Sequence, residues 1–350
     1  MHDFSDAISY AEAHEVAWPR DPAADPGRWG VHHADPPPFN RLLGPVHARG
    51  GVSGVIRVGG KEVASWGEPD RADLTFSVAK GYLALLAGVA QARGLLPDPQ
   101  QPVARMLPGI GFDDPHNAAI TWAHLLEQTS EWSGSCFGIP DQVEHNRRVA
   151  LDPKPPQGAK GEARVLQPPG TWWEYNDVRI NQFALALLHL FRRPLPQVFE
   201  EAVLRPLGGP GPGWQWVGYP QAWVEIDGQR MPSVPGGSHW GGGVSISARD
   251  QARIAQMLLD GGMHEGRQLV PADWVRRMQQ PSAVAPFYGW LTWLNRDGRM
   301  FADASRESWF LFGAGGHYTW IDPANDAVVV VRWIDAARMP GFVSRVVKAL

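Results

Sequence analysis

The sequence predicts an α/β protein: an antiparallel sheet flanked by terminal helices, with an inserted mainly helical domain. Runs of strand-forming residues bounded by turns occur at 55–66 and again over the last hundred residues. The longest stretches with apolar residues at helical spacing lie between them. Strands from both ends are most simply joined in one sheet. We therefore expect an α/β domain from 1–75 and 208–350, a helical domain over 76–207, and an active site at their junction.

Helices are predicted where apolar residues recur every three or four positions. The clearest runs begin near Ser77 and Asp177, and each places leucine, alanine or aromatic side chains on one face. Thr121 and Ser247 precede two other such runs, where a hydroxyl can cap the first free backbone N–H groups. The predicted helices cover residues 6–13, 77–92, 122–127, 177–190, 200–207, 247–259 and 342–349.

Strands are predicted where β-branched and aromatic residues lie between turn residues. Gly59-Gly60 and Asp227-Gly228 each separate two such runs, which is typical of a hairpin. Asp297-Gly298 and Asn325-Asp326 supply turns in the last hundred residues. The predicted strands are the hairpins at 55–66 and 223–231, followed by 288–294, 319–322 and 327–334.

Residues 130–169 have the composition of a long loop that ends in a proline-rich run. Loops of this length in compact proteins often form a lid or a pocket wall. Several of the 17 tryptophans stand in such Gly/Pro-rich stretches, namely Trp132, Trp172, Trp173, Trp214 and Trp240. We expect them to line a pocket rather than a core, with Trp132 and Trp240 in the substrate site.

Composition excludes several partners and cofactors. A net charge of −4 leaves no basic footprint for nucleic acid, and no run approaches the ~20 apolar residues that span a bilayer. The single cysteine, Cys136, forms no internal disulfide and belongs to no metal-binding pattern. Residues 1–19 lack the apolar core of a signal peptide. We expect a cytoplasmic protein without metal or cofactor, and nothing in the sequence predicts an oligomeric state.

Ser77 and Lys80 lie three residues apart at the start of the first long helix, hence on one face. A serine hydroxyl is a weak nucleophile until a base takes its proton, and a lysine can serve when burial favours its neutral form. Ser77 is the only serine with lysine at the third following position. The alternative is a helix-capping serine followed by a solvated lysine, and Ser-x-x-Lys alone is a weak signal.

Three further stretches have the character of site residues. Tyr175 precedes the second long helix, and a tyrosine beside an ammonium can act in proton transfer; alternatively, it is a packed ring and Asp177 an ordinary cap. The glycine run 313–317 enters a strand and can leave backbone N–H groups free for an oxyanion, or can simply bend the sheet. The turn 239–243 is expected to be structural.

Five motifs occur in one order. They are Phe76-Ser-Val-Ala-Lys80, Leu125-Leu-Glu-Gln-Thr-Ser130, Pro169-Gly-Thr-Trp-Trp-Glu-Tyr-Asn-Asp177, Gly242-Gly-Val-Ser-Ile-Ser247, and Gly315-Gly316 before Ile321-Asp-Pro323. This order and spacing resemble the penicillin-recognising serine hydrolases. Within them the chain looks like the class C β-lactamase-related branch, which includes esterases, D-amino-acid-releasing peptidases and 6-aminohexanoate-dimer hydrolase.

The resemblance covers roughly residues 50 to 335 and implies a β-lactamase/transpeptidase-like fold. It implies that Ser77 is the acylated nucleophile, that Lys80 is its partner, and that Tyr175 is the tyrosine of the family's Tyr-x-Asn motif. The backbone N–H groups of Ser77 and His317 would form the oxyanion hole. The implied activity is hydrolysis of a small ester or amide.

Two departures from the family pattern bear on the substrate. Asp177 stands where the family commonly has an amide, and we expect it to cap its helix and to tune Lys80 and Tyr175. Ala314-Gly315-Gly316 replaces a motif that usually begins with a cation, which disfavours β-lactams. The alternatives are a β-lactamase or D-amino-acid peptidase, which the missing signal peptide disfavours, and a catalytically idle binding or scaffold relative, which the intact serine, lysine and tyrosine disfavour.

Overall fold

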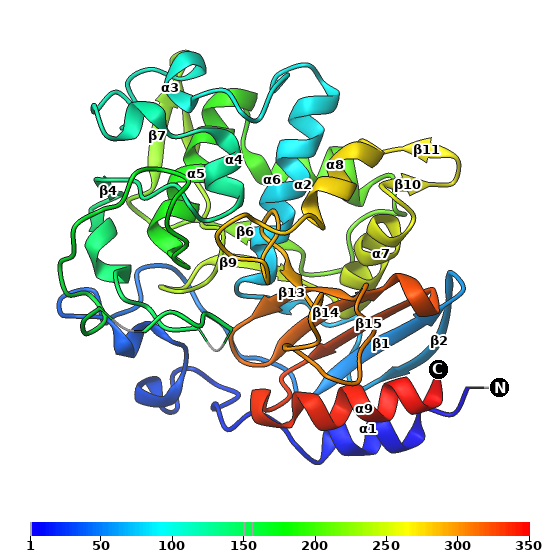
Figure 1. Cartoon of the computed structure of the whole chain (residues 1–350). Helices are drawn as coiled ribbons and strands as arrows, with labels where there is room; N and C mark the ends of the chain where they lie inside the picture. The colour runs from blue at the N-terminus through cyan, green and yellow to red at the C-terminus, as the bar shows by residue number, and fades with distance from the viewer. Residues whose placement is uncertain (1, 150, 156) are drawn as a thin grey trace.

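A six-stranded antiparallel sheet combines strands from both ends of the chain (Figure 1). The computed structural model describes residues 2–149, 151–155 and 157–350. The strand order is β12-β13-β14-β15-β1-β2, and β1 pairs along its whole length with β15, from Ser53 opposite Arg332 to Val58 opposite Ala327. This confirms the predicted fold class. The strands are β1 (Ser53–Val58), β2 (Lys61–Trp66), β12 (Trp293–Leu294), β13 (Trp309–Gly313), β14 (His317–Asp322) and β15 (Ala327–Arg332).

Helices cover both faces of this sheet. The terminal helices α1 (Ser5–Glu12) and α9 (Met339–Ala349) lie side by side below it in the view of Figure 1. On the opposite face, α7 (Ala248–Leu259) contacts β1, β14 and β15. Each helix buries an apolar stripe against the sheet, which is the usual way to stabilise such layers.

The helix α2 (Val78–Ala92) connects the sheet to the helical part of the molecule. It is buried from Val78 to Ala90 and contacts both α5 (Asp177–Phe191) and β13. Gly81 permits the close approach to β13, because a Cβ atom there would lie 2.6 Å from Leu311 Cδ2. The first residues of α2 are therefore held at the boundary between the sheet and the helical part.

A second sheet has three strands in the order β3-β9-β6, and its strand β3 immediately precedes α2 in the chain. Its strand β3 ends at Leu74, and Thr75 still donates a backbone hydrogen bond to Val244 of β9 at 2.8 Å. None of the helices in the described ranges has the length and apolar character needed to cross a bilayer. The remaining elements are β3 (Asp73–Leu74), α3 (Val103–Met106), α4 (Trp122–Leu126), β4 (Ser135–Cys136), β5 (Ile139–Pro140), α6 (Leu195–Phe199), β6 (Gln215–Val217), β7 (Trp223–Ile226), β8 (Gln229–Pro232), β9 (Gly243–Ile246), β10 (Met263–His264), β11 (Arg267–Gln268) and α8 (Ala272–Met278).

Two parts of the predicted secondary structure differ from the structure. The strand expected over 288–294 is confined to β12, because Gly289 donates to the Thr292 carbonyl at 2.9 Å and Leu291 has a positive φ of 55°. The helix expected over 200–207 is instead α6 followed by a π-helical turn over Glu200–Leu204. Strand β13 was not predicted.

Candidate active site

Ser77 occupies the N-cap position of α2 but does not cap it. No side-chain capping hydrogen bond is present, and Ser77 Oγ instead accepts a hydrogen bond from Lys80 Nζ at 2.7 Å. The hydroxyl belongs to a half-buried residue, whereas Val78 and the helix beyond it are fully buried. The structure therefore removes the alternative of a simple helix cap and leaves the hydroxyl beside a lysine.

Phe76 fixes the direction in which Ser77 leaves the preceding strand. Its backbone has φ 51°, a left-handed conformation that costs free energy in a residue with a bulky side chain. Its ring is held against Trp18, Trp29 and Trp333, at ring-centroid distances of 5.4, 5.6 and 6.2 Å. This packing stabilises a sharp turn that points the next side chain, Ser77, away from the core.

Lys80 is buried rather than solvated. Its side chain is 1% exposed, and its ammonium forms an ion pair with Asp177 Oδ1 in addition to the bond to Ser77. The same nitrogen lies 4.7 Å from the centroid of the Tyr175 ring. The structure therefore brings together Ser77, Lys80, Tyr175 and Asp177, all four of which the sequence predicted as site residues.

The expectation that Asp177 caps α5 is wrong. The N-cap is Asn176, whose Oδ1 accepts hydrogen bonds from the backbone N–H groups of Val178 and Arg179 at 2.9 and 3.2 Å. Asparagine caps a helix about as well as aspartate, so the neighbouring Asn176 fills this position. The Asp177 carboxylate is thereby free to face the site, where its side chain is 3% exposed.

Two cations hold the Asp177 carboxylate in its charged form. Oδ1 pairs with Lys80 and Oδ2 with Arg147, and His239 Nδ1 lies 3.4 Å from Oδ2. Burial by itself would raise the pKa of Asp177, but Lys80 and Arg147 outweigh burial and hold that pKa well below its usual range. The site therefore contains a fixed negative charge next to the Ser77–Lys80 pair.

Behind Asp177 lies a buried charge cluster that the sequence did not predict. Glu144 pairs with both Arg147 and Lys160, and Lys160 and His239 both contact Asp35. Glu144, Arg147 and Lys160 belong to the long stretch 130–169, whereas Asp35 and His239 come from distant segments of the chain. No sequence motif joins these segments, so the sequence did not indicate that they meet. His239 lay in the turn 239–243, where the expected role was structural.

Tyr175 lies with its ring against the two cations of the site. The centroid of its ring is 4.7 Å from Lys80 Nζ and 5.0 Å from Arg147 Cζ, and the ring packs at 5.4 Å against Trp293. Among the described residues, the hydrogen bonds of Lys80 go to Ser77 and Asp177. The aromatic face therefore contributes favourable cation–π contacts at a buried site.

The glycine-rich turn at the end of β13 leads into His317, the first residue of β14, which pairs with Gly313. The His317 ring is fully buried, 4.3 Å from the Trp333 ring, and its two nitrogens have no partner among the described residues. Burial holds the pKa of His317 well below its ordinary value, so the ring is neutral. Gly315 and Gly316 have φ of 77° and 78°, and a Cβ at Gly316 would lie 1.7 Å from the Ile334 carbonyl oxygen.

Trp132 and Trp240 are not brought to Ser77. Trp240 is fully buried and donates hydrogen bonds to Asp35 Oδ2 at 2.8 Å and to the Phe39 carbonyl at 3.0 Å, so it anchors the N-terminal segment. Trp132 lines a separate recess, which it shares with residues such as Cys136 and none of Ser77, Lys80 or Tyr175. Position in a glycine-rich loop did not reveal where either side chain points.

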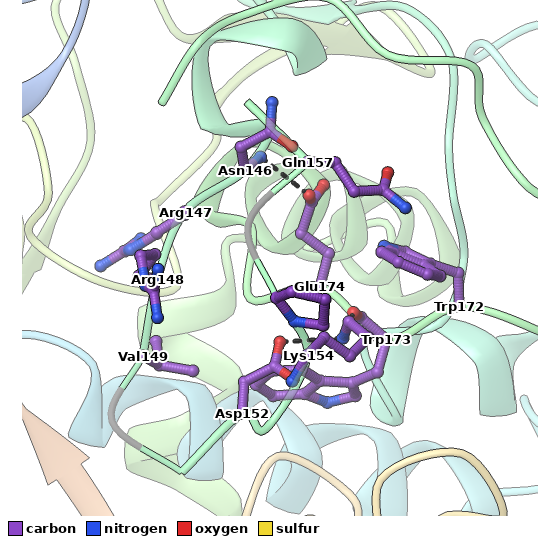
Figure 2. Close-up of a pocket in the computed structure, with 11 residues that line it drawn as sticks. Asn146, Arg147, Arg148, Val149, Asp152, Lys154, Gln157, Trp172, Trp173 and Glu174 are labelled. Carbon is purple, nitrogen blue, oxygen red and sulfur yellow. Dashed lines mark hydrogen bonds and ion pairs between the residues drawn. The ribbon is translucent and has the colours of Figure 1, made fainter. Parts of the chain in front are cut away.

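A different pair of tryptophans lines a recess that touches the charge cluster (Figure 2). Trp172 and Trp173 face Arg147 and Arg148 across this recess, and Lys154 packs on the two indoles at 4.7 and 5.2 Å from their centroids. Arg147 is thus shared between the recess and the ion pair with Asp177 described above. The recess is rich in cations, with Arg147, Arg148 and Lys154 in its lining.

The loop before β9 lies against Ser77, Lys80 and Asp177. A Cβ atom at Gly237 would lie 3.0 Å from Lys80 Nζ, 3.0 Å from Asp177 Oδ1 and 3.3 Å from Ser77 Oγ. The backbone at Gly237 therefore lies directly against these three polar atoms, and a side chain at this position would compete with them for space. The site is built from three segments: the start of α2, the start of α5 and this loop.

Replacing Asp177 with asparagine is expected to change both stability and pH dependence. The free energy of unfolding should fall by on the order of 3 kcal/mol, because the buried cations lose a charged partner. Loss of a negative charge also weakens the hold of the site on its proton, so the acidic limb of the kcat/KM profile should move to lower pH by more than about half a unit. An unmoved profile together with an unchanged melting temperature would contradict this role.

The pH dependence of that stability loss has a definite sign. Because the folded-state pKa of Asp177 is depressed, its contribution to stability is present above the unfolded pKa of about 4 and is lost as the pH falls through the folded value. The difference in unfolding free energy between the wild type and Asp177→Asn should therefore shrink on acidification below about pH 4. Denaturant titrations at several pH values measure it.

Comparison with known proteins places this geometry in a family. The model of the family described as "Beta-lactamase" matches residues 13–336. A 6-aminohexanoate-dimer hydrolase from Paenarthrobacter ureafaciens is 31% identical over 118 residues, which are 31% of this chain and only 30% of that relative. A penicillin-binding protein homologue from Caulobacter crescentus superimposes with a TM-score of 0.61 at 17% identity, over 91% of this chain and 96% of its own. A family VIII carboxylesterase superimposes with a TM-score of 0.61 at 17% identity, over 85% of this chain and 92% of its own. This chain belongs to the Beta-lactamase family of penicillin-recognising serine hydrolases.

Proposed function

We propose that this protein is a serine hydrolase that forms an acyl-enzyme at Ser77 and hydrolyses a small ester or amide. The observation that supports this most directly is the 2.7 Å contact between Ser77 Oγ and the buried Lys80 Nζ. A nucleophile within hydrogen-bond reach of a candidate base, with that base oriented by a third group, is the arrangement that activates a hydroxyl. Here Asp177 is the third group.

The proposed reaction proceeds in two halves. Ser77 Oγ attacks the carbonyl carbon while its proton passes to Lys80 or Tyr175, and the backbone N–H groups of Ser77 and His317 stabilise the oxyanion. The tetrahedral intermediate expels the alcohol or amine, which takes up that proton, and leaves the acyl group on Ser77. The same base then takes a proton from water, which attacks the carbonyl carbon of the acyl-enzyme. The bond to Ser77 Oγ breaks, the serine oxygen takes back that proton, and the acid is released.

Active-site labelling tests the proposal. A fluorophosphonate probe, followed by digestion and mass spectrometry, should modify Ser77 in the wild-type protein and leave Ser77→Ala unmodified. An idle binding or scaffold relative would not react above the rate of a denatured sample. This readout needs no knowledge of the physiological substrate, and its failure would overturn the assignment of Ser77 as nucleophile.

The substrate preference can be tested with a small panel. Ala314 stands where the resemblance to the family implies a cation that often contacts a β-lactam carboxylate, so we expect nitrocefin and benzylpenicillin to be poorer substrates than short acyl p-nitrophenyl esters. The similarity to a 6-aminohexanoate-dimer hydrolase makes linear amides the third class to include. Values of kcat/KM for all three classes decide the order, and a value for nitrocefin above that of every ester would contradict this prediction.

A further inference from the structure

We propose that His239 is a positioning residue that acts through Asp177. It would set the proton affinity of the base that takes the Ser77 proton, whether that base is Lys80 or Tyr175. This inference rests on the proposed hydrolase function. It gives a chemical role to a residue of a glycine-rich turn that makes no contact with the nucleophile itself. The line of contacts runs from Asp35 to His239, Asp177, Lys80 and Ser77.

The imidazole of His239 lies between two carboxylates. Its Nε2 is 2.8 Å from Asp35 Oδ2, and its Nδ1 is 3.4 Å from Asp177 Oδ2. A neutral imidazole carries one N–H, so it can donate to only one of these oxygens and turns a lone pair toward the other. The imidazolium donates to Asp35 through Nε2 and at the same time places its positive charge within ion-pair distance of Asp177, although Nδ1 forms no hydrogen bond among the described residues. The geometry therefore fits a charged ring, and the His239 side chain is only 3% exposed.

The surrounding charges favour the same form. Glu144 Oε1 lies 3.6 Å from Nε2 and favours the charged ring, whereas the Arg147 guanidinium disfavours it. Burial lowers the pKa of His32 to about 4, and the Trp240 ring packs against His239 at 4.3 Å. Burial by itself lowers the pKa of His239, but Glu144, Asp177 and Asp35 outweigh burial and raise it above its ordinary value.

A cation at His239 offsets part of the charge of Asp177. Asp177 Oδ1 pairs with Lys80, whereas Oδ2 is shared by Arg147 and His239. Removing the imidazolium leaves more of the carboxylate charge to hold a proton at the centre. The sign is the same whether Lys80 or Tyr175 is the base, because losing a nearby positive charge strengthens proton binding to either group.

Two isosteric variants separate charge from hydrogen bonding. In His239→Gln the amide nitrogen can take the place of Nε2 and keep the bond to Asp35, whereas in His239→Asn it can take the place of Nδ1 and stay near Asp177. Both variants lose the charge. We expect both to move the acidic limb of the Ser77 labelling rate to higher pH by up to about one unit, less than the roughly one to three units of a direct contact, because His239 contacts Asp177 and not the titrating group.

A matched control is available in His145. It is also buried and bonds an aspartate, with Nε2 2.8 Å from Asp141 Oδ2, but it makes no contact with Asp177. His145→Gln should therefore leave the labelling profile unmoved. If neither His239 variant folds, Asp35→Asn removes one of the carboxylates that favour the imidazolium and should move the limb in the same direction by a smaller amount.

The rate of fluorophosphonate labelling at Ser77 is measured from pH 5 to 9 for the wild type and each variant. An acidic limb that stays in place in both folded His239 variants overturns the inference. A shift in His239→Asn with none in His239→Gln also overturns it, because the bond to Asp35 alone would then explain the effect. Absence of labelling in the wild type would overturn the proposed function instead, so the two failures are distinguishable.

Discussion

Ser77→Ala is expected to lower kcat/KM by about 10⁴- to 10⁶-fold, the usual loss when a covalent nucleophile is removed. The fold should survive, because the Ser77 hydroxyl caps no backbone group and its hydrogen bond is the one from Lys80. We expect the free energy of unfolding to change by no more than about 0.5 kcal/mol. Steady-state kinetics on a p-nitrophenyl ester and thermal unfolding measure the two quantities.

Ser247 provides the matched control for this variant. It is the N-cap of α7, and its Oγ accepts a hydrogen bond from the Asp250 backbone N–H at 3.0 Å. Ser247→Ala should therefore cost about 1 kcal/mol of stability and leave turnover close to that of the wild type. Activity of Ser77→Ala within tenfold of the wild type would show that Ser77 is not the nucleophile.

Lys80→Ala is expected to have the second-largest effect, a loss of at least about 10²-fold in kcat/KM. It removes the group that contacts Ser77 Oγ. It also removes one of the two ion pairs of the buried Asp177 and leaves the pair with Arg147. Some loss of stability should accompany it. Lys61 is an exposed lysine of β2, so Lys61→Ala should change neither quantity.

Tyr175→Phe should also lower kcat/KM by on the order of 10²-fold, and the double variant reveals whether the two residues act as a unit. If Lys80 and Tyr175 share one proton-transfer step, removing the second after the first costs much less than it does alone. The combined loss should then be far below the product of the single losses. Multiplicative losses would show that the two residues act independently.

The parts of the site that could be predicted are those encoded locally. Ser77 and Lys80 are placed by one turn of one helix, so their spacing alone brings them together. Asp35, Arg147 and His239 meet only because loops far apart in the sequence fold onto one point. No spacing or composition records such a meeting, because each contact is made by a side chain whose direction depends on the whole fold.

Strand β13 shows the same limit at the level of the fold. Trp309, Phe310 and Leu311 are all buried, so the strand lacks the alternation of apolar and polar residues that marks a half-exposed strand. The turn residues around β14 and β15 were read correctly because Asn325-Asp326 is a strong local signal, and Asp326 indeed adopts a positive φ of 46°. Turn residues therefore located β14 and β15, whereas β13, the buried strand between β12 and β14, was not predicted.

The pairing of β1 with β15 sets the order in which the chain can assemble. The side chains of Ser53 and Arg332, which meet across this pair, are 279 residues apart in the sequence. At roughly 5–20 residues per second, a ribosome needs about 14 to 56 s to make the stretch between them. During that time the edge of β1 that pairs with β15 has no partner, and Val55 and Ile56, which are buried on opposite faces of the finished sheet, lack their neighbours from β15. Closure of the sheet is therefore a late and long-range event. Until then β1 exposes an unpaired edge, which could pair with other chains unless a chaperone covers it.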